Sequence, residues 1–76
     1  MDQEELKRKI AEFDTHWIPG TEDFRGGRRF DQLRAELAQS AAENLALFTD
    51  VVLEYVSEHQ LSRAHQTRLL LAICYP

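Results

Sequence analysis

The longest part of the sequence without proline or glycine runs from residue 28 to residue 60. It is rich in alanine, leucine, glutamate and glutamine, all of which favour helices. Its apolar side chains recur at steps of three and four residues, which is the spacing of one face of an α-helix. These side chains are Leu37, Ala41, Leu45, Phe48, Val52 and Tyr55. We therefore predict one long helix over residues 29–60, onto which the rest of this short chain must pack.

Two places in the long helix carry signals for a break. The sequence SAAE, from Ser40 to Glu43, has the form of a capping box, which begins a helix. A run of residues with lower helix propensity begins at Thr49. A break near Ser40 or Thr49 would divide the long helix in two and give four helices instead of three.

The apolar face of the predicted long helix is wide. It covers about 200° of arc, whereas packing against one neighbour needs roughly 100°. We expect a second copy of the chain to cover part of this face, because a twofold homodimer is the commonest way to bury such a surface. The alternative is a break that closes a monomeric four-helix bundle. The predicted self-association residues are Ala41, Leu45, Phe48, Val52, Tyr55 and Val56.

A shorter helix is predicted before the long one, over residues 2–17. Its apolar side chains form one narrow stripe, the pattern of a surface helix with a single buried face. They are Leu6, Ile10, Phe13 and Trp17. Pro19 disfavours a helical conformation at the residue before it and so ends this helix near Trp17. We expect Trp17 to be substantially buried against the long helix.

The remaining segments complete a single domain. A loop that contains proline, glycine and arginine spans residues 18–28. Ser62 is a good N-cap for a C-terminal helix over residues 62–75, whose apolar side chains spread around several sides. The predicted fold is all-α: a small helical bundle of three principal helices, within one domain over residues 1–76.

Composition narrows the class of protein. Hydrophobic residues make up 43% of the chain and charged residues 29%, which is typical of a globular domain. The single cysteine excludes an internal disulfide and fits a reducing compartment. The longest apolar run, LLLAICY, is too short to cross a bilayer, and the N-terminal segment lacks the apolar stretch of a signal peptide. We expect a soluble, cytoplasmic protein with no membrane partner.

The segment FRGGRRF, residues 24–30, is the most specialised part of the sequence. It places Arg25, Arg28 and Arg29 between two phenylalanines in a chain with a net charge of −4. Our first interpretation is a flexible loop whose phenylalanines anchor its ends to the core while its arginines pair with nearby acids. Those acids are Glu22, Asp23 and Asp31.

Two functional interpretations of this arginine loop rank after the flexible-loop interpretation. The loop could bind an acidic partner protein or a small anion, because guanidinium groups near a helix N-terminus attract carboxylates and phosphates. It could also bind nucleic acid through phosphate contacts and base stacking. The pI of about 5.2 argues against a broad phosphate-binding surface.

Other chemical signals in the sequence are weak. His16, His59, His65 and Cys74 lack the spacing of metal ligands, and Cys74 lies in an apolar run typical of an inert core residue. The glycines do not match a phosphate-binding loop. We therefore predict no catalytic residues, no metal and no cofactor.

These observations predict a small, non-catalytic protein–protein interaction or regulatory protein. It would assemble through apolar helix faces, with a homodimer as the expected form. The alternative is a nucleic-acid-associated regulator that uses Arg25, Arg28 and Arg29.

Overall fold

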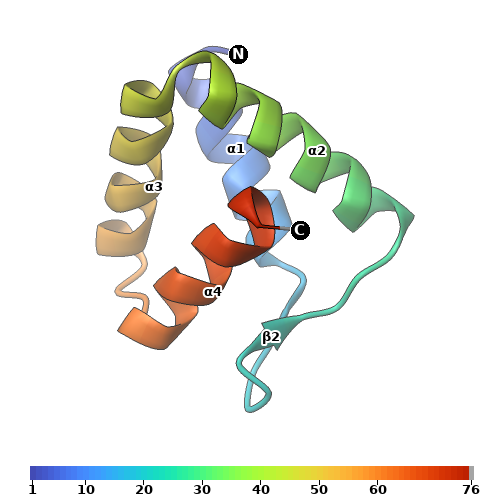
Figure 1. Ribbon diagram of the computed structural model, residues 1–76. Coiled ribbons are helices and arrows are strands. Elements are labelled where there is room, and N and C mark those ends of the chain that lie inside the picture. The colour runs from blue at the N-terminus through green and yellow to red at the C-terminus, as the bar shows by residue number, and fades with distance from the viewer. Residues whose placement is uncertain (76) are drawn as a thin grey trace.

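Four helices and one short hairpin make up the computed structural model, which describes residues 1–75 (Figure 1). The prediction of a small all-α bundle, with a fourth helix allowed, is confirmed. The elements in chain order are α1 (Gln3–Asp14), β1 (Trp17–Ile18), β2 (Asp23–Phe24), α2 (Arg28–Glu43), α3 (Leu45–Glu58) and α4 (Arg63–Cys74).

The predicted long helix is divided at Asn44, between the two positions that the sequence signals favoured. The backbone of Asn44 leaves the helical region, with φ −151° and ψ 84°. Its amide N–H donates to the carbonyl of Ser40 at 3.0 Å and so closes α2. Its side-chain oxygen accepts from the amide of Leu47 at 3.1 Å and so begins α3. An asparagine that caps both helices can therefore end one and start the next without a glycine or proline.

The break has a large effect on packing. In Figure 1, α2 and α3 form the two arms of an inverted V, and α4 crosses the open side of the V. The first helix, α1, packs against both α2 and α3, while α4 packs against α2 and β2. The wide apolar arc of the predicted long helix is thus shared between two helices that bury it against the same chain.

The N-terminal helix is shorter than predicted, because α1 ends at Asp14 rather than near Trp17. The chain then enters an antiparallel hairpin in which Trp17 pairs with Phe24 and Ile18 pairs with Asp23. Gly20, in the turn of this hairpin, has a φ of 90°, a conformation that favours glycine. The segment predicted as a loop over residues 18–28 therefore contains most of a two-stranded hairpin.

The core lies where the four helices meet. Leu6, Ile10 and Phe13, the stripe predicted for the first helix, are fully buried. The other fully buried apolar side chains come from the remaining three helices; they are Leu33, Leu37, Phe48, Val51, Val52, Leu69 and Ile73. Ser62 caps α4 as predicted, because its hydroxyl accepts from the amide of His65 at 3.1 Å. Within residues 1–75, no helix has the length and apolar character needed to cross a membrane.

The two phenylalanines of the arginine segment anchor it to this core, as predicted. The ring of Phe30 stacks on that of Phe13, with 4.5 Å between centroids. The ring of Phe24 also contacts Phe13, at 5.1 Å. The hairpin and the start of α2 are therefore both held against the end of α1.

Candidate functional site

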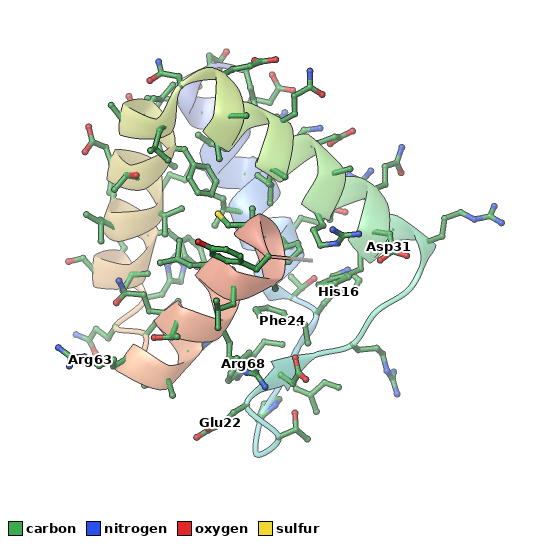
Figure 2. All side chains as sticks on the ribbon, in the orientation of Figure 1. His16, Glu22, Phe24, Asp31, Arg63 and Arg68 are labelled. Carbon is green, nitrogen blue, oxygen red and sulfur yellow. The ribbon has the colours of Figure 1, made fainter. Side chains whose placement is uncertain are left out.

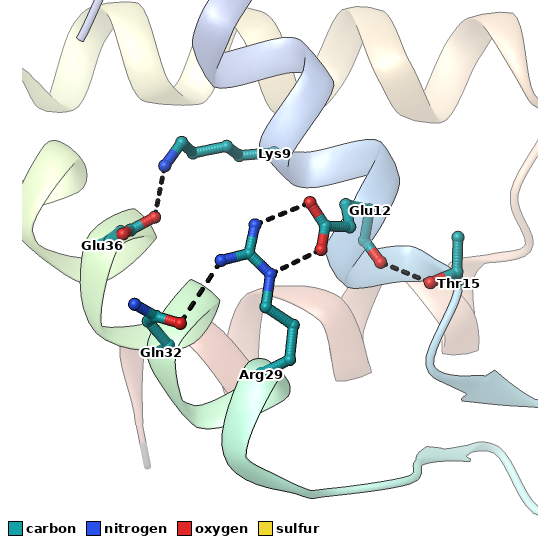
Figure 3. Close-up of polar contacts among 6 residues, drawn as sticks. All are labelled: Lys9, Glu12, Thr15, Arg29, Gln32 and Glu36. Carbon is teal, nitrogen blue, oxygen red and sulfur yellow. Dashed lines mark hydrogen bonds and ion pairs between the residues drawn. The ribbon is translucent and has the colours of Figure 1, made fainter.

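Arg29, the last arginine of the FRGGRRF segment, is committed to an ion pair inside the molecule. Its Nε donates to Glu12 Oε2 at 2.6 Å and its Nη2 donates to Glu12 Oε1 at 2.8 Å (Figure 3). These hydrogen bonds lower the pKa of Glu12. The predicted acidic partners on nearby positions are thus wrong for Arg29, because helix packing brings α1 closer than the loop acids.

Arg25 and Arg28, the other two predicted site residues, lie apart from this ion pair. Both side chains are exposed, and within residues 1–75 neither forms an ion pair with an acidic residue. The amide of Arg25 donates to the carbonyl of His16 at 2.7 Å, which ties the end of the hairpin to the end of α1. Arg29 is therefore held by Glu12 while Arg25 and Arg28 stay exposed, and a binding role for the three arginines stays a prediction.

A different pair of arginines lies at a single groove. Arg34 on α2 and Arg68 on α4 line the same groove, which has a volume of about 370 Å³. We call it the arginine groove. Its lining residues are Asp23, Phe24, Gly26, Phe30, Arg34, Arg68, Leu71, Ala72 and Tyr75. Neither arginine is predicted as a site residue from the sequence, because the two are far apart in sequence and only the packing of α4 on α2 brings them to the same groove.

The two arginines of the groove differ in how they are held. Arg68 points from α4 toward the hairpin, where its Nε donates to the carbonyl oxygen of Glu22 at 3.1 Å (Figure 2). Arg34 is half-buried. Within residues 1–75, neither guanidinium forms an ion pair with a carboxylate. The groove therefore presents positive charge that the described part of the chain does not neutralise.

The rest of the arginine groove is mainly apolar. Phe24 of β2 and Phe30 of α2 line it, together with Leu71 and Ala72 of α4 and Tyr75, which follows α4. Leu71 is 39% exposed and Tyr75 is 76% exposed. Asp23 is the one acidic residue among the lining residues, and its Oδ1 accepts from the amide of Phe24 at 2.8 Å. This surface can therefore receive a ligand that has both an anionic and an apolar part.

A second polar arrangement lies inside the molecule, around the carboxylate of Asp14. The hydroxyl of Tyr55 donates to Asp14 Oδ2 at 2.8 Å, and His65 Nε2 lies 2.6 Å from Asp14 Oδ1. Both side chains of the Asp14–His65 pair are only 12% exposed. Burial, and then the hydrogen bond to Asp14, raise the pKa of Tyr55 well above its ordinary value. Asp14 thus links the end of α1 to both α3 and α4.

Trp17 covers this polar cluster. Its ring stacks on that of His65, with 3.8 Å between centroids and 9° between planes, and it also contacts Phe24. Trp17 is half-buried against these two rings rather than buried against the predicted long helix. The correction follows from the hairpin, which turns Trp17 away from the end of α1 and toward α4.

The Asp14 cluster has the parts of a catalytic dyad but is arranged for support. A histidine that is oriented by a carboxylate activates a nucleophile only when that nucleophile lies within hydrogen-bond reach. Within residues 1–75, the ring of His65 forms its hydrogen bond with Asp14 and none with a serine, threonine or cysteine, and the hydroxyl of Ser62 accepts from the backbone amide of His65. The cluster therefore positions α1, α3, α4 and the hairpin relative to one another.

The predicted self-association surface needs correction. Ala41, Phe48, Val52 and Tyr55 are each less than 9% exposed within a single chain, so they belong to its own core. Val56 is half-buried, and Leu45 is 65% exposed. The break at Asn44 is the reason, because it folds α3 back beside α2. The homodimer itself stays a prediction, and a different surface would have to form it.

The described residues offer little for metal or thiol chemistry. Within the described residues, no group of three histidine, cysteine, aspartate or glutamate side chains could hold a metal ion. The sequence predicts that Cys74 lies in the core, but it is exposed. It comes directly after the buried Ile73, on the outer side of the last turn of α4.

Comparison with known proteins gave no match to a family model, to a curated protein or to a solved structure.

Proposed function

We propose that this protein is a non-catalytic interaction protein, and that the arginine groove is its contact face for a partner protein. This is the class of function predicted from the sequence, but the proposed contact face differs from the predicted one. The proposed contact face is a groove formed by the hairpin, α2 and α4. It replaces the arginine loop and the apolar face of the predicted long helix.

The exposed apolar side chains at the groove are the observation that carries this proposal. Leu71 and Tyr75 are two of the large hydrophobic residues that the fold leaves exposed, and both line the groove beside Arg34 and Arg68. Aromatic residues and arginine are enriched in protein interfaces, where they supply most of the binding free energy. An apolar surface with arginines at its edge is therefore typical of a protein contact site.

A protein partner suits this groove better than nucleic acid. Nucleic-acid affinity depends on many phosphate contacts made by a continuous basic surface. The chain has a net charge of −4, and α3 carries exposed acids at Asp50, Glu54 and Glu58. The apolar lining of the groove would also contribute little to contacts with a phosphate backbone.

The test compares two leucines that are both exposed and both lie on helices. A photo-crosslinking amino acid is placed at the position of Leu71, in the groove, or of Leu53, which is 49% exposed on α3. Each variant is irradiated in an extract of the native host, and the captured protein is identified and purified. Calorimetry then measures its affinity for the wild-type protein, Leu71→Glu and Leu53→Glu, with circular dichroism to show that both variants fold.

We expect capture at position 71 only, with a loss of affinity of about tenfold or more for Leu71→Glu and none for Leu53→Glu. Capture of the same protein at both positions, or equal affinity for both variants, would contradict the proposal. Failure to capture any protein at position 71 would also count against it.

A further inference from the structure

We infer, on the basis of the proposed function, that the arginine groove binds an acidic peptide segment in which a carboxylate lies next to a large apolar side chain. The two arginines would hold the carboxylate, and the apolar walls would hold its neighbour. This partner chemistry follows from the charge, the burial and the shape of the groove.

Arg34 gives the first reason. Most arginines of the chain that lack an ion pair within residues 1–75 are exposed, as are Arg8, Arg25, Arg28 and Arg63. Arg34 also lacks one, yet it is half-buried. The packed part of the side chain restricts its position, while its guanidinium stays accessible, since within the described residues no buried side-chain nitrogen lacks a partner. A carboxylate bound in the groove would give this guanidinium an ionic partner.

The available donors of Arg68 give the second reason. Its Nε is used by the carbonyl of Glu22, which fixes the direction of the side chain. Within the described residues, its two terminal nitrogens donate no hydrogen bond to another residue. A guanidinium that is already oriented loses less conformational entropy when it binds a carboxylate. Arg68 is therefore prepared to donate to an anion in the groove.

The acid at the groove offsets the charge of only one of these two cations. Asp23 lines the groove, but its carboxylate accepts from the amide of Phe24 and forms no ion pair with Arg34 or Arg68. Two arginines and one aspartate leave one net positive charge among the lining residues. This local charge is opposite in sign to that of the whole chain, which is −4. The groove therefore selects for an anionic ligand that the rest of the surface repels.

Shape and polarity favour a peptide over a phosphate or a nucleic acid. The volume of about 370 Å³ is near the small end of the range for ligand sites, roughly 300–1,000 Å³, so it fits a short segment rather than a folded surface. Leu71, Ala72 and Tyr75 form an apolar wall beside the two arginines. An aliphatic or aromatic side chain would bury this wall, whereas an isolated anion would leave it in water.

The test uses fluorescence anisotropy with labelled probes. The main probe is a short peptide in which glutamates alternate with leucines. The second has glutamine in place of each glutamate, and the third has serine in place of each leucine. A single-stranded oligothymidine is the fourth probe. We expect the first peptide to bind about tenfold or more tightly than each of the others, because only it satisfies both parts of the groove.

Two arginine variants and two matched controls locate the binding. Arg34→Gln and Arg68→Gln should each weaken binding of the acidic peptide about tenfold. Arg8→Gln and Arg63→Gln remove the same charge from exposed positions and should leave the affinity unchanged. Figure 2 shows Arg63 at the far end of α4 from the hairpin, whereas Arg68 points toward it.

Failure of this inference can be told apart from failure of the proposed function. Equal binding of the glutamate and glutamine peptides, or no binding of the acidic peptide at millimolar concentration, would overturn the inference. If the captured partner still loses affinity for Leu71→Glu, the proposed function stands without it. Tighter binding of oligothymidine that depends on Arg34 and Arg68 would overturn the inference in favour of nucleic acid.

Discussion

The polar side chains of α1 and those of the arginine groove differ in whether they have charged partners within the described part of the chain. Along α1, charged residues find partners on all three other helices. Lys7 donates to Glu54 and Glu58 on α3, at 3.0 and 2.7 Å. Lys9 pairs with Glu36 on α2. Farther along, Glu12 pairs with Arg29 of α2, and Asp14 accepts from α3 and α4. The polar groups of α1 therefore contribute to holding the fold together.

The groove lies between the hairpin, α2 and α4, where these polar groups of α1 do not reach. Arg29 and Arg34 illustrate the difference because they belong to the same helix. The first has a bidentate carboxylate partner from α1, and the second has none within the described residues. We infer that a polar side chain here serves structure when it faces α1 and is available for binding when it faces the groove. Substitutions on the two sides should consequently affect different properties.

Loss of the Asp14 carboxylate should have the largest effect on stability. Asp14→Ala would leave the hydroxyl of Tyr55 and the ring of His65 without their partner in the interior. We expect it to lower the free energy of unfolding by about 3 kcal/mol, which is a large part of the stability of so small a domain. Asp14→Asn keeps the shape and one acceptor, and should cost less.

Urea denaturation monitored by circular dichroism measures both Asp14 variants. A free energy of unfolding for Asp14→Ala within about 0.5 kcal/mol of the wild type would show that the cluster does not hold the helices together. It would also remove the distinction between the α1 side and the groove.

The start of α2 is the next test, because it sets where Arg29 and Arg34 lie. Gly27 precedes the helix with a φ of 142° and a ψ of 173°, a conformation essentially restricted to glycine. Gly27→Ala should lower the free energy of unfolding by about 1–3 kcal/mol. Gly26→Ala is a matched control, since Gly26 lacks this positive φ and an added Cβ would meet no atom within 4 Å. Thermal denaturation should show a loss for the first variant only; equal melting temperatures would contradict this account.

Much of this fold can be predicted from local sequence. The stripe of Leu6, Ile10 and Phe13 is the buried face of α1, and Ser62 begins α4. Periodicity and capping depend on residues within a few positions of each other, so the sequence contains them directly. The sequence signals predict a break a few residues from Asn44, because a single asparagine that caps both helices is a weaker signal than a capping box.

The candidate site could not be predicted in the same way. Arg34 and Arg68 share a groove, and Asp14 meets Tyr55 and His65, only because separate helices pack together. Periodicity tells which face of a helix is buried but not which helix covers it. The arginine segment was conspicuous in the sequence, yet the ion pair of Arg29 with Glu12 depends on the same long-range packing.

The smallest effect on stability, and the sharpest contrast, is expected from Arg29→Gln and Arg34→Gln. Arg29→Gln should slightly lower the melting temperature at neutral pH and leave binding of the acidic peptide unchanged. Arg34→Gln should leave the melting temperature unchanged and weaken binding of the acidic peptide. The reason is that it removes a charge that has no partner within residues 1–75. If both variants change the same property, the α1 side and the groove are not functionally distinct.

The pH dependence of the melting temperature identifies the origin of the Arg29 effect. Arg29 lowers the pKa of Glu12 in the folded protein, so this ion pair stabilises the fold fully above the ordinary glutamate pKa of 4.5. The stabilisation is lost as the pH falls through the lowered pKa of Glu12. The difference between the wild type and Arg29→Gln should therefore be constant near neutral pH and disappear in acid. It should also shrink with added salt, because both side chains are exposed to screening. A difference that persists in strong acid would assign the effect to the packing of the Arg29 side chain rather than to its charge.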